Sequence, residues 1–114
     1  MITVVRKSYP SLRGSVLRDF VEILSNEGWY HEKYHNKTES SYNLWGTTWS
    51  FISVDNPQKI RGRKQQICFC NEINELSLED FRQLILRTSM IFVGNFNPSD
   101  EYHWLYDEVI PRDD

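Results

Sequence analysis

The sequence predicts an α/β fold in which a largely parallel sheet is flanked by helices. Segments of strand type alternate along the chain with segments of helical periodicity, which is the pattern of this class. Two of the strand segments, Ile67–Cys70 and Met90–Val93, are continuously apolar, as is typical of parallel strands that are covered on both faces. The length of 114 residues suits one domain with a single modest core.

The first predicted elements are a strand and a helix. Ile2–Val5 is a β-branched run of strand type, and Tyr9-Pro10 predicts the turn that follows it. Ser15–Ser25 has apolar residues at helical spacing, and Gly28 predicts the end of this helix. The residues expected to face the core are Val16, Phe20, Ile23 and Leu24.

A hairpin is predicted next. Residues 29–41 are polar and predict a loop or an irregular hairpin arm. Tyr42–Trp45 and Thr48–Val54 predict the two arms around a turn at residues 46–47, because apolar residues alternate in the second arm. Residues 55–57, Asp-Asn-Pro, predict the turn that closes it.

The second half predicts two more strands and two helices. A basic loop at residues 59–64 leads to the strand Ile67–Cys70. Ser77 has the position of a helix N-cap, with Asp80 in the place where a capping box has Glu or Gln, and the helix is expected to run to about Arg87. Its inward-facing residues are expected to be Leu78, Phe81, Leu84 and Ile85. After Met90–Val93, residues 95–98 predict an exit turn, and a last helix is expected between Ser99 and Pro111.

Composition limits the classes of function. The net charge of −3 and the pI near 5.6 argue against stand-alone binding of nucleic acid, which usually needs a basic domain. No apolar run is long enough to span a bilayer, and the amino terminus lacks the features of a signal peptide, so a cytoplasmic location is expected. Cys68 and Cys70 project from the same face of a strand, which disfavours a disulfide between them and predicts two reduced thiols.

The strongest candidate site follows the strand Ile67–Cys70. The carboxyl ends of parallel strands point into the crevice where ligands of α/β proteins bind. A carboxylate fixed there can deprotonate a water for attack on a terminal phosphate, and Glu72 is the candidate base. Asn71 stands where an Asp associated with Mg²⁺ is expected, and a neutral amide serves that role less well. The alternative is that Glu72 is a solvated acid at a strand end.

Two further groups could contact phosphates. Asn95 and Asn97 leave the next apolar strand, and their amides would lie beside Glu72 if the two strands are neighbours; the alternative is an ordinary turn. The cationic run of Arg61, Arg63 and Lys64 could meet phosphates of a nucleotide or of DNA, although such runs are more often solvated.

A zinc site is a third alternative. His31 and His35 are four residues apart, and Cys68 and Cys70 could add two thiolates to complete a tetrahedral site. The one-residue spacing of the cysteines, in a strand expected to be buried, argues against this set.

Four segments of the chain together carry a family resemblance. They are ITVVRKSYPSLRGSVLRDFVEIL, SFISVDNPQKIRG, ICFCNEINELSLEDFRQLILR and IFVGNFNPSDEYHWLYDEVI. They occur in order over nearly the whole chain, and the combination of NE-x-NEL-S with FNPSD-x-x-HWLY is specific. In these features the chain resembles the ATPase domain of tailed-phage terminase large subunits, most closely the prophage PBSX-like branch.

The resemblance implies an ATP-driven motor that packages double-stranded DNA into preformed capsids, working with a portal and a small terminase subunit. It implies a RecA-like P-loop NTPase fold of the additional-strand type, with ATP and Mg²⁺ as cofactors. By this resemblance Ile67–Glu72 is the Walker B strand, Glu72 is the catalytic glutamate, and Asn95 to Pro98 form the coupling segment that links nucleotide state to movement. Asn71 departs from the acidic residue usual in the family.

The 114 residues contain no G-x-x-x-x-G-K-[ST] phosphate loop and no nuclease domain. We therefore expect a partial ATPase domain that lacks the Walker A strand, and little or no ATP binding or hydrolysis by this chain alone. In the family's sheet order the Walker A strand lies beside the strand matching Met90–Val93, so that strand is expected to be an open edge. The alternative function is a non-catalytic interaction module that docks on a terminase or portal partner through this exposed edge.

Overall fold

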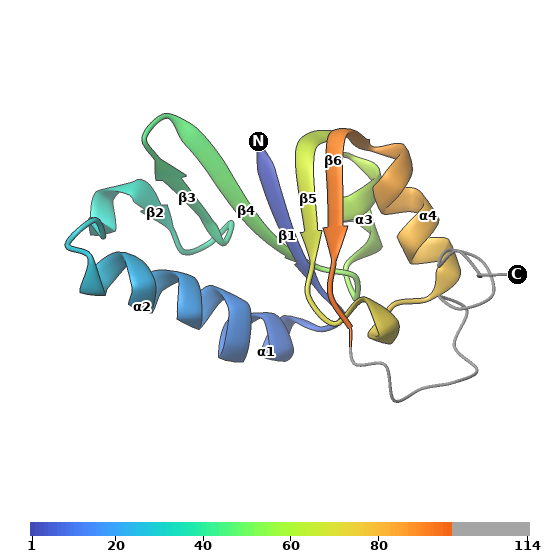
Figure 1. The fold of residues 1–114 in the computed structure, drawn as a ribbon, viewed down its shortest axis with the longest axis horizontal. Helices are drawn as coiled ribbons and strands as arrows, with labels where there is room; N and C mark the ends of the chain where they lie inside the picture. Colours follow the sequence, from blue (N-terminus) through green and yellow to red (C-terminus); the bar gives the residue numbers. More distant parts are fainter. Residues whose placement is uncertain (97–114) are drawn as a thin grey trace, which may run out of the picture.

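A six-stranded sheet forms the centre of the protein in the computed structural model (Figure 1). The structure describes residues 1–96, so Asn97 and the helix expected between Ser99 and Pro111 lie outside the described residues. The strand order is β2-β3-β4-β1-β5-β6. The strands are β1 (Ile2–Arg6), β2 (His35–Asn36), β3 (Ser41–Leu44), β4 (Thr47–Ser53), β5 (Gln65–Cys70) and β6 (Thr88–Gly94).

The pairing confirms a largely parallel α/β sheet. β1 lies between β4 and β5 and is parallel to both, and β5 is parallel to β6. Only the small strands β2 and β3 add antiparallel pairing, at the β4 side. The arrowheads of β1, β5 and β6 point to the same edge of the sheet (Figure 1). The loops that leave these three strands therefore meet at one edge.

The first helical segment is longer than the sequence predicts. It consists of α1 (Tyr9–Leu12), a π-helical turn (Arg13–Leu17) and α2 (Arg18–Asn26), in direct succession. The predicted turn at Tyr9-Pro10 is wrong, because Ser8 caps the helix and its Oγ accepts a hydrogen bond from the Ser11 N–H. Proline in the first turn costs no helical hydrogen bond, since that N–H has no partner there anyway. Gly28 follows the helix with a φ of +76°, as expected of a glycine stop.

Two helices cover the other end of the sheet. The first part of the predicted basic loop is helical instead, as α3 (Pro57–Arg61), and it is held by the buried side chain of Ile60. The cap of α4 (Leu78–Leu86) is confirmed, because Ser77 Oγ accepts a hydrogen bond from the Asp80 N–H at 3.1 Å. Short 3-10 helices at Glu32–Tyr34 and Ile73–Glu75 complete the described elements. No described helix is long and apolar enough to cross a membrane.

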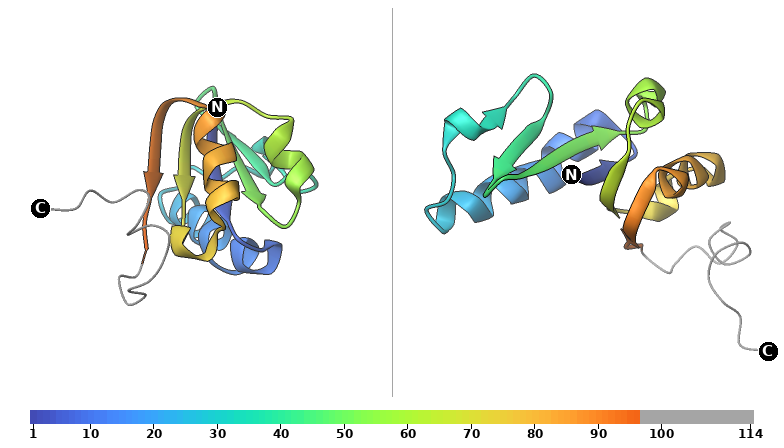
Figure 2. Two further views of the ribbon diagram at one scale, coloured as in Figure 1. Left: turned by 90° about the vertical axis from the view of Figure 1, so that its right-hand side faces the viewer. Right: turned by 90° about the horizontal axis from the view of Figure 1, so that it is seen from above.

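The core lies on both faces of the sheet. On the face of α3 and α4 it comprises Val5, Ile52, Ile60, Cys68, Cys70, Ile73, Leu76, Phe81 and Leu84. On the face of α1 and α2 it comprises Val4, Leu12 and Phe51, with Val16, Leu17, Phe20, Trp49 and Phe69 packed against them. Figures 1 and 2 show α2 running beside the β2–β4 half, whereas α4 lies beside β5 and β6.

The outer strand β6 and parts of the helices α2 and α4 are exposed. Met90, Ile91 and Val93 in β6 have exposed fractions of 71%, 50% and 45%, so the expectation that both apolar strands are covered on both faces is wrong for β6. Ile23 and Ile85 are also exposed, contrary to the inward-facing positions that helical spacing predicts for them. β6 is the outer strand of the described sheet, as the family resemblance implies.

Candidate functional site

The candidate site lies where β5 and β6 end. Asn71 and Glu72 follow β5, and Asn95 follows β6. The side-chain Oδ1 of Asn95 accepts a hydrogen bond from the Glu72 N–H at 2.8 Å, and the Asn95 N–H donates to the Cys70 carbonyl at 3.1 Å. The Ile73 N–H donates to the Asn95 carbonyl at 2.8 Å. The sequence-predicted proximity of Asn95 and Glu72 is therefore confirmed, and the amide fixes the backbone that carries the carboxylate.

Glu72 has an unusual backbone. Its φ and ψ are both 56°, in the left-handed region that residues with a Cβ rarely adopt. Backbone hydrogen bonds to Asn95 Oδ1 and from the Glu75 N–H hold this conformation. Among residues 1–96 the half-buried carboxylate itself has no hydrogen bond or ion pair, so its side chain does not offset the strain. Backbone strain of this kind is concentrated at functional sites.

A neighbouring amide, Asn74, has no role predicted from the sequence. Its Oδ1 is buried and has no hydrogen-bond partner among the described residues. An orphaned buried oxygen is normally satisfied by water, an ion or a ligand. The sequence signal for this residue is its place in the run Asn71-Glu-Ile-Asn74, which predicts an amide-rich turn and nothing more specific.

These residues fit a magnesium ion only together with a phosphate ligand. Mg²⁺ is usually held by one or two carboxylates plus substrate phosphates and waters. At this edge Glu72 offers one carboxylate, and Asn71 and Asn74 offer amide oxygens. No group of three or more His, Cys, Asp or Glu side chains that could hold a metal occurs within the described residues.

An ion pair supports the same edge from β1. Arg6 Nε donates to Glu75 Oε1 at 3.0 Å, and Arg6 Nη1 donates to Ser15 Oγ at 2.8 Å. The Glu75 N–H in turn donates to the Glu72 carbonyl at 2.9 Å. Arg6 thus ties the first helical segment and the 3-10 turn after Glu72 to the end of β1.

The two cysteines belong to the core. Cys68 and Cys70 are free and fully buried on one face of β5. A hydrogen bond with Cys68, together with burial, raises the pKa of the Cys70 thiol well above its ordinary value, which disfavours a thiolate ligand. The His35 ring instead contacts the Tyr30 hydroxyl, with 2.7 Å between Nδ1 and Oη. The zinc alternative is wrong, since its four residues, all of them described, are not brought together.

The cationic run lies at the opposite edge of the sheet from Glu72. Arg61, Arg63 and Lys64 come directly before the start of β5, whereas Glu72 follows its end. They line, with Arg87, a hollow of about 460 Å³, which adjoins a second one of about 360 Å³ beside the start of β6. Arg63 is partly buried, its guanidinium donates to Ser50 Oγ, and burial lowers its pKa. Within one chain these cations are therefore not part of the Glu72 site.

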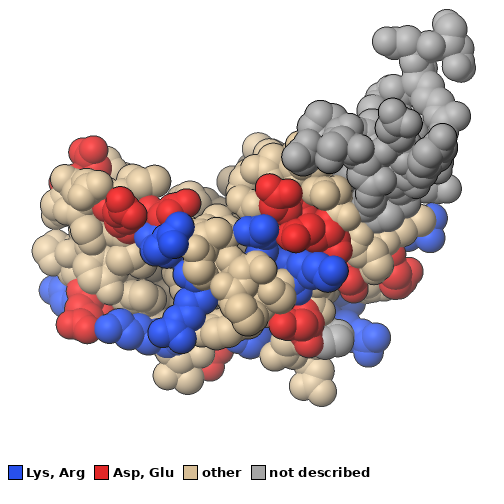
Figure 3. Space-filling view, turned by 90° about the horizontal axis from the view of Figure 1, so that it is seen from below, with Lys and Arg blue, Asp and Glu red and all other residues tan. Residues whose placement is uncertain are grey.

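The face seen from the Glu72 edge carries charges of both signs. Lys and Arg side chains alternate there with Asp and Glu side chains and form no field of a single sign (Figure 3). A large basic patch, the usual footprint of a domain that grips nucleic acid by charge, is absent from the part of this face formed by described residues.

Comparison with known proteins places the chain in a family. Residues 1–114 match the family described as phage terminase large subunit. No curated protein matches the chain by sequence. The fold is similar to that of the large terminase from a thermophilic bacteriophage, with a TM-score of 0.78, 18% identity, and coverage of 94% of this chain and 28% of the terminase.

Two complexes of the same phage protein with nucleotides are also similar. The complex with ADP gives a TM-score of 0.72 at 23% identity and covers 94% of this chain and 28% of that one. The complex with ATP-gamma-S gives a TM-score of 0.72 at 18% identity and covers 94% of this chain and 27% of that one. This chain therefore spans little more than a quarter of the length of the terminases that it resembles. The match over its whole length shows that the chain belongs to the phage terminase large-subunit family.

Proposed function

We propose that this chain forms part of the ATP-hydrolysing domain of a phage DNA-packaging motor, with Glu72 as the base that activates the attacking water. One observation carries the proposal: Glu72 stands at the carboxyl edge of a parallel sheet, held there by Asn95, and its carboxylate is unengaged by residues 1–96. The family membership and the nucleotide complexes of the similar phage terminase support it.

In this role each residue has a distinct task. The Glu72 carboxylate accepts a proton from water as the water attacks the terminal phosphate. Asn71 and Asn74 would offer amide oxygens at this edge, where Mg²⁺ bound together with ATP would neutralise the charge of the phosphates. Asn95, with Asn97 as the other amide of the coupling segment, transmits the nucleotide state, because any movement of the Asn95 side chain shifts the Glu72 backbone through their hydrogen bond.

The phosphate loop must then come from another segment. None of the five glycines in the chain belongs to a G-x-x-x-x-G-K-[ST] motif, so backbone amides and a lysine that cradle the phosphates have to be supplied. The exposed edge of β6 and the partly covered face beside it offer a place for an added strand and helix. In this proposal residues 1–114 are a partial ATPase domain, without a Walker A segment or a nuclease domain.

A complementation experiment tests this proposal. We expect the chain alone to hydrolyse almost no ATP, and Glu72→Gln to change nothing there. Fusion to a phosphate-loop segment from a relative should restore ATP binding and phosphate release. In the fused protein Glu72→Gln should lower kcat about 100-fold or more while ATP binding is kept.

The matched control is Glu79→Gln, which removes an exposed carboxylate on α4 that bonds only Gln83 among described residues. It should leave kcat unchanged. Restored hydrolysis that survives Glu72→Gln contradicts the assignment of the base, whereas binding that is never restored favours the second function below.

That second function is a non-catalytic interaction module. The seven residues of β6 carry no charge, and three of their apolar side chains are about half exposed or more. An uncharged outer strand can accept an extended segment of a terminase or portal partner. Binding should then protect the β6 amides from hydrogen exchange, and Ile91→Lys should abolish association without lowering Tm, whereas Ile23→Lys on α2 should not affect it.

We further propose that double-stranded DNA, the portal and the small terminase subunit are partners of the assembled motor in the host-cell cytoplasm. Arg61, Arg63 and Lys64 lie away from Glu72 in the same chain, so they are too distant to contact the nucleotide bound there. In this proposal they contact DNA phosphates instead. Lys64→Ala in the assembled motor should then weaken binding to DNA of any sequence. It should also reduce the slope of the logarithm of the binding constant against the logarithm of salt concentration by about one. An unchanged salt slope rejects the contact.

A further inference from the structure

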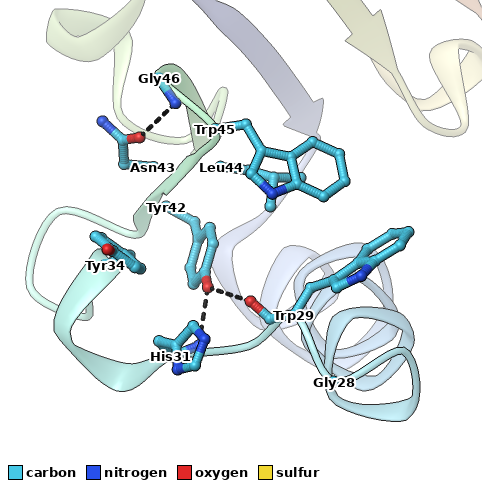
Figure 4. Close-up of a pocket in the computed structure, with 9 residues that line it drawn as sticks. All are labelled: Gly28, Trp29, His31, Tyr34, Tyr42, Asn43, Leu44, Trp45 and Gly46. Carbon is cyan, nitrogen blue, oxygen red and sulfur yellow. Dashed lines mark hydrogen bonds between the residues drawn. The ribbon is translucent and has the colours of Figure 1, made fainter.

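A second concave site lies on the hairpin lobe, which we define as residues 28–46. It is a pocket of about 270 Å³ between the loop after α2, the 3-10 helix Glu32–Tyr34 and the β3–β4 turn (Figure 4). Its principal walls are Trp29, His31, Tyr34, Tyr42, Leu44 and Trp45. Figure 1 places this lobe at the β2–β3 end of the sheet, far from the end of β5 that carries the Glu72 site.

The floor of the pocket is rigid. Tyr42 is almost fully buried, and its hydroxyl accepts a hydrogen bond from the His31 N–H at 2.9 Å and donates to the Trp29 carbonyl at 3.1 Å. The ring of Tyr30 stacks on that of Tyr42 with 5.6 Å between centroids. The loop that carries Trp29 is therefore attached to β3 through the Tyr42 hydroxyl.

Trp45 forms the upper wall from a strained turn. It has a φ of +51° and precedes Gly46 at +83°, which are the angles of a two-residue hairpin turn that prefers Asn-Gly. A bulky aromatic residue is unfavourable in this conformation. Its side chain is 74% exposed, so burial in the core does not compensate for the strain. Contact with the Trp29 ring is the one ring contact of this side chain within residues 1–96, and strain kept at so exposed a residue points to a role for the side chain itself.

The two tryptophans are arranged as an open aromatic wall. Their rings meet edge to face, with 4.9 Å between centroids and 64° between planes, and both are exposed. Neither indole N–H has a hydrogen-bond acceptor within residues 1–96. The site thus offers flat apolar faces together with two free donors.

The charges around the pocket argue against single-stranded nucleic acid as its ligand. No Lys, Arg, Asp or Glu among the described residues lines the pocket. The two lysines of the lobe are engaged, Lys33 over the Tyr34 ring at 5.0 Å and Lys37 with Glu32 at 2.9 Å. Stacking of single-stranded nucleic acid needs a cationic groove for the backbone as well as aromatic platforms, and this lobe does not supply one.

We propose that the pocket binds a proline-rich extended segment of a partner protein. Polyproline II segments dock in aromatic-lined grooves, and their carbonyls are free because this helix has no internal hydrogen bonds. The indole N–H groups of Trp29 and Trp45 donate to such carbonyls, while proline rings pack on the tryptophan and tyrosine faces. This site is independent of the function proposed for Glu72.

The test uses the full chain and an acetylated, amidated peptide of about eight prolines. Binding is followed by the ¹H–¹⁵N shifts of the indole N–H groups of Trp29 and Trp45. The informative variant is Trp45→Asn, because it removes the wall but places a favoured residue at the strained turn position. The matched control is Leu86→Asn, which removes a similarly exposed apolar side chain at the end of α4.

We expect saturable shifts of both indole signals in the wild type and in Leu86→Asn. Trp45→Asn should bind the peptide at least about tenfold more weakly, with a Tm no lower than that of the wild type. Absence of saturable shifts, or equal affinity in Trp45→Asn, overturns the proposal. Saturable shifts with oligothymidylate and none with the proline peptide also overturn it and identify a platform for nucleobases.

Discussion

The left-handed backbone of Glu72 predicts that glycine at this position stabilises the protein. An L-residue in this region costs about 1–2 kcal/mol relative to the ordinary conformations. Glycine avoids this cost but loses about 0.5–1 kcal/mol more backbone entropy on folding. The carboxylate has no hydrogen bond or ion pair within residues 1–96 that the change would remove. Glu72→Gly should therefore raise the free energy of unfolding by up to about 1.5 kcal/mol, with a central value of about 0.75 kcal/mol that corresponds to a rise in Tm of about 2–6 °C for a domain of this size.

The assay is urea denaturation followed by tryptophan fluorescence, with a thermal scan beside it. Glu72→Ala is the control, because alanine removes the same carboxylate but keeps a Cβ in the left-handed conformation; its free energy of unfolding should stay within about 0.5 kcal/mol of the wild type. If glycine and alanine shift the unfolding midpoint equally, the strain inferred from the φ of +56° does not exist.

Three further outcomes are expected. Leu84→Ala, in the core beneath α4, should cost about 2–5 kcal/mol in urea denaturation, and a cost below about 1 kcal/mol would contradict its burial. Burial, together with the charge of Lys37, lowers the pKa of His35 below its ordinary 6.5. Below pH 6.5 the unfolded chain therefore binds a proton at His35 more readily than the folded chain does, and the free energy of unfolding should fall as the pH drops. His35→Gln should flatten this dependence in urea midpoints measured from about pH 5 to 7.5, and an unchanged slope would exclude His35 as its source. In the protein complemented with a phosphate loop, Asn71→Asp should lower the Mg²⁺ concentration that gives half-maximal ATPase activity, and no change would remove Asn71 from the metal's surroundings.

Local patterns predicted most of the described elements. The β-branched run of β1, the apolar pattern of β4 and the Ser77 cap all express preferences set by neighbouring residues, and the structure has both strands and the cap. The alternation read in β4 is not kept, because its last four residues are all buried. Tyr9-Pro10 is ambiguous because proline suits both a turn and the first turn of a helix. The five-residue helix α3 has the same ambiguity at Asn56-Pro57, and the burial of Ile60 against distant residues decides for the helix. The exposure of β6 could not be predicted from an apolar run, which is the same for an edge strand and a central one.

The two candidate sites also combine features that the sequence predicts with features that depend on packing. The proximity of Glu72 and Asn95 follows from parallel topology alone, since both residues leave neighbouring strands at the same edge. The strained backbone of Glu72 and the orphaned oxygen of Asn74 depend on how the turn packs, and no local pattern encodes them. The aromatic pocket could not be predicted from the sequence either, because residues 29–41 have the composition of a polar loop. The pocket depends on the Tyr42 hydroxyl, which forms hydrogen bonds with the His31 N–H and the Trp29 carbonyl of this loop.

The central position of β1 constrains how the chain folds during synthesis. Ile2 pairs with Trp49 on one side and with Ile67 on the other, so β1 pairs only with strands that lie much later in the sequence and are synthesised after it. Pairings between such distant residues require closure of long loops, which slows folding. Until Ile67 emerges, Ile2–Arg6 lacks one of its two neighbouring strands, and a chaperone that shields this β-branched segment should raise the yield of folded protein.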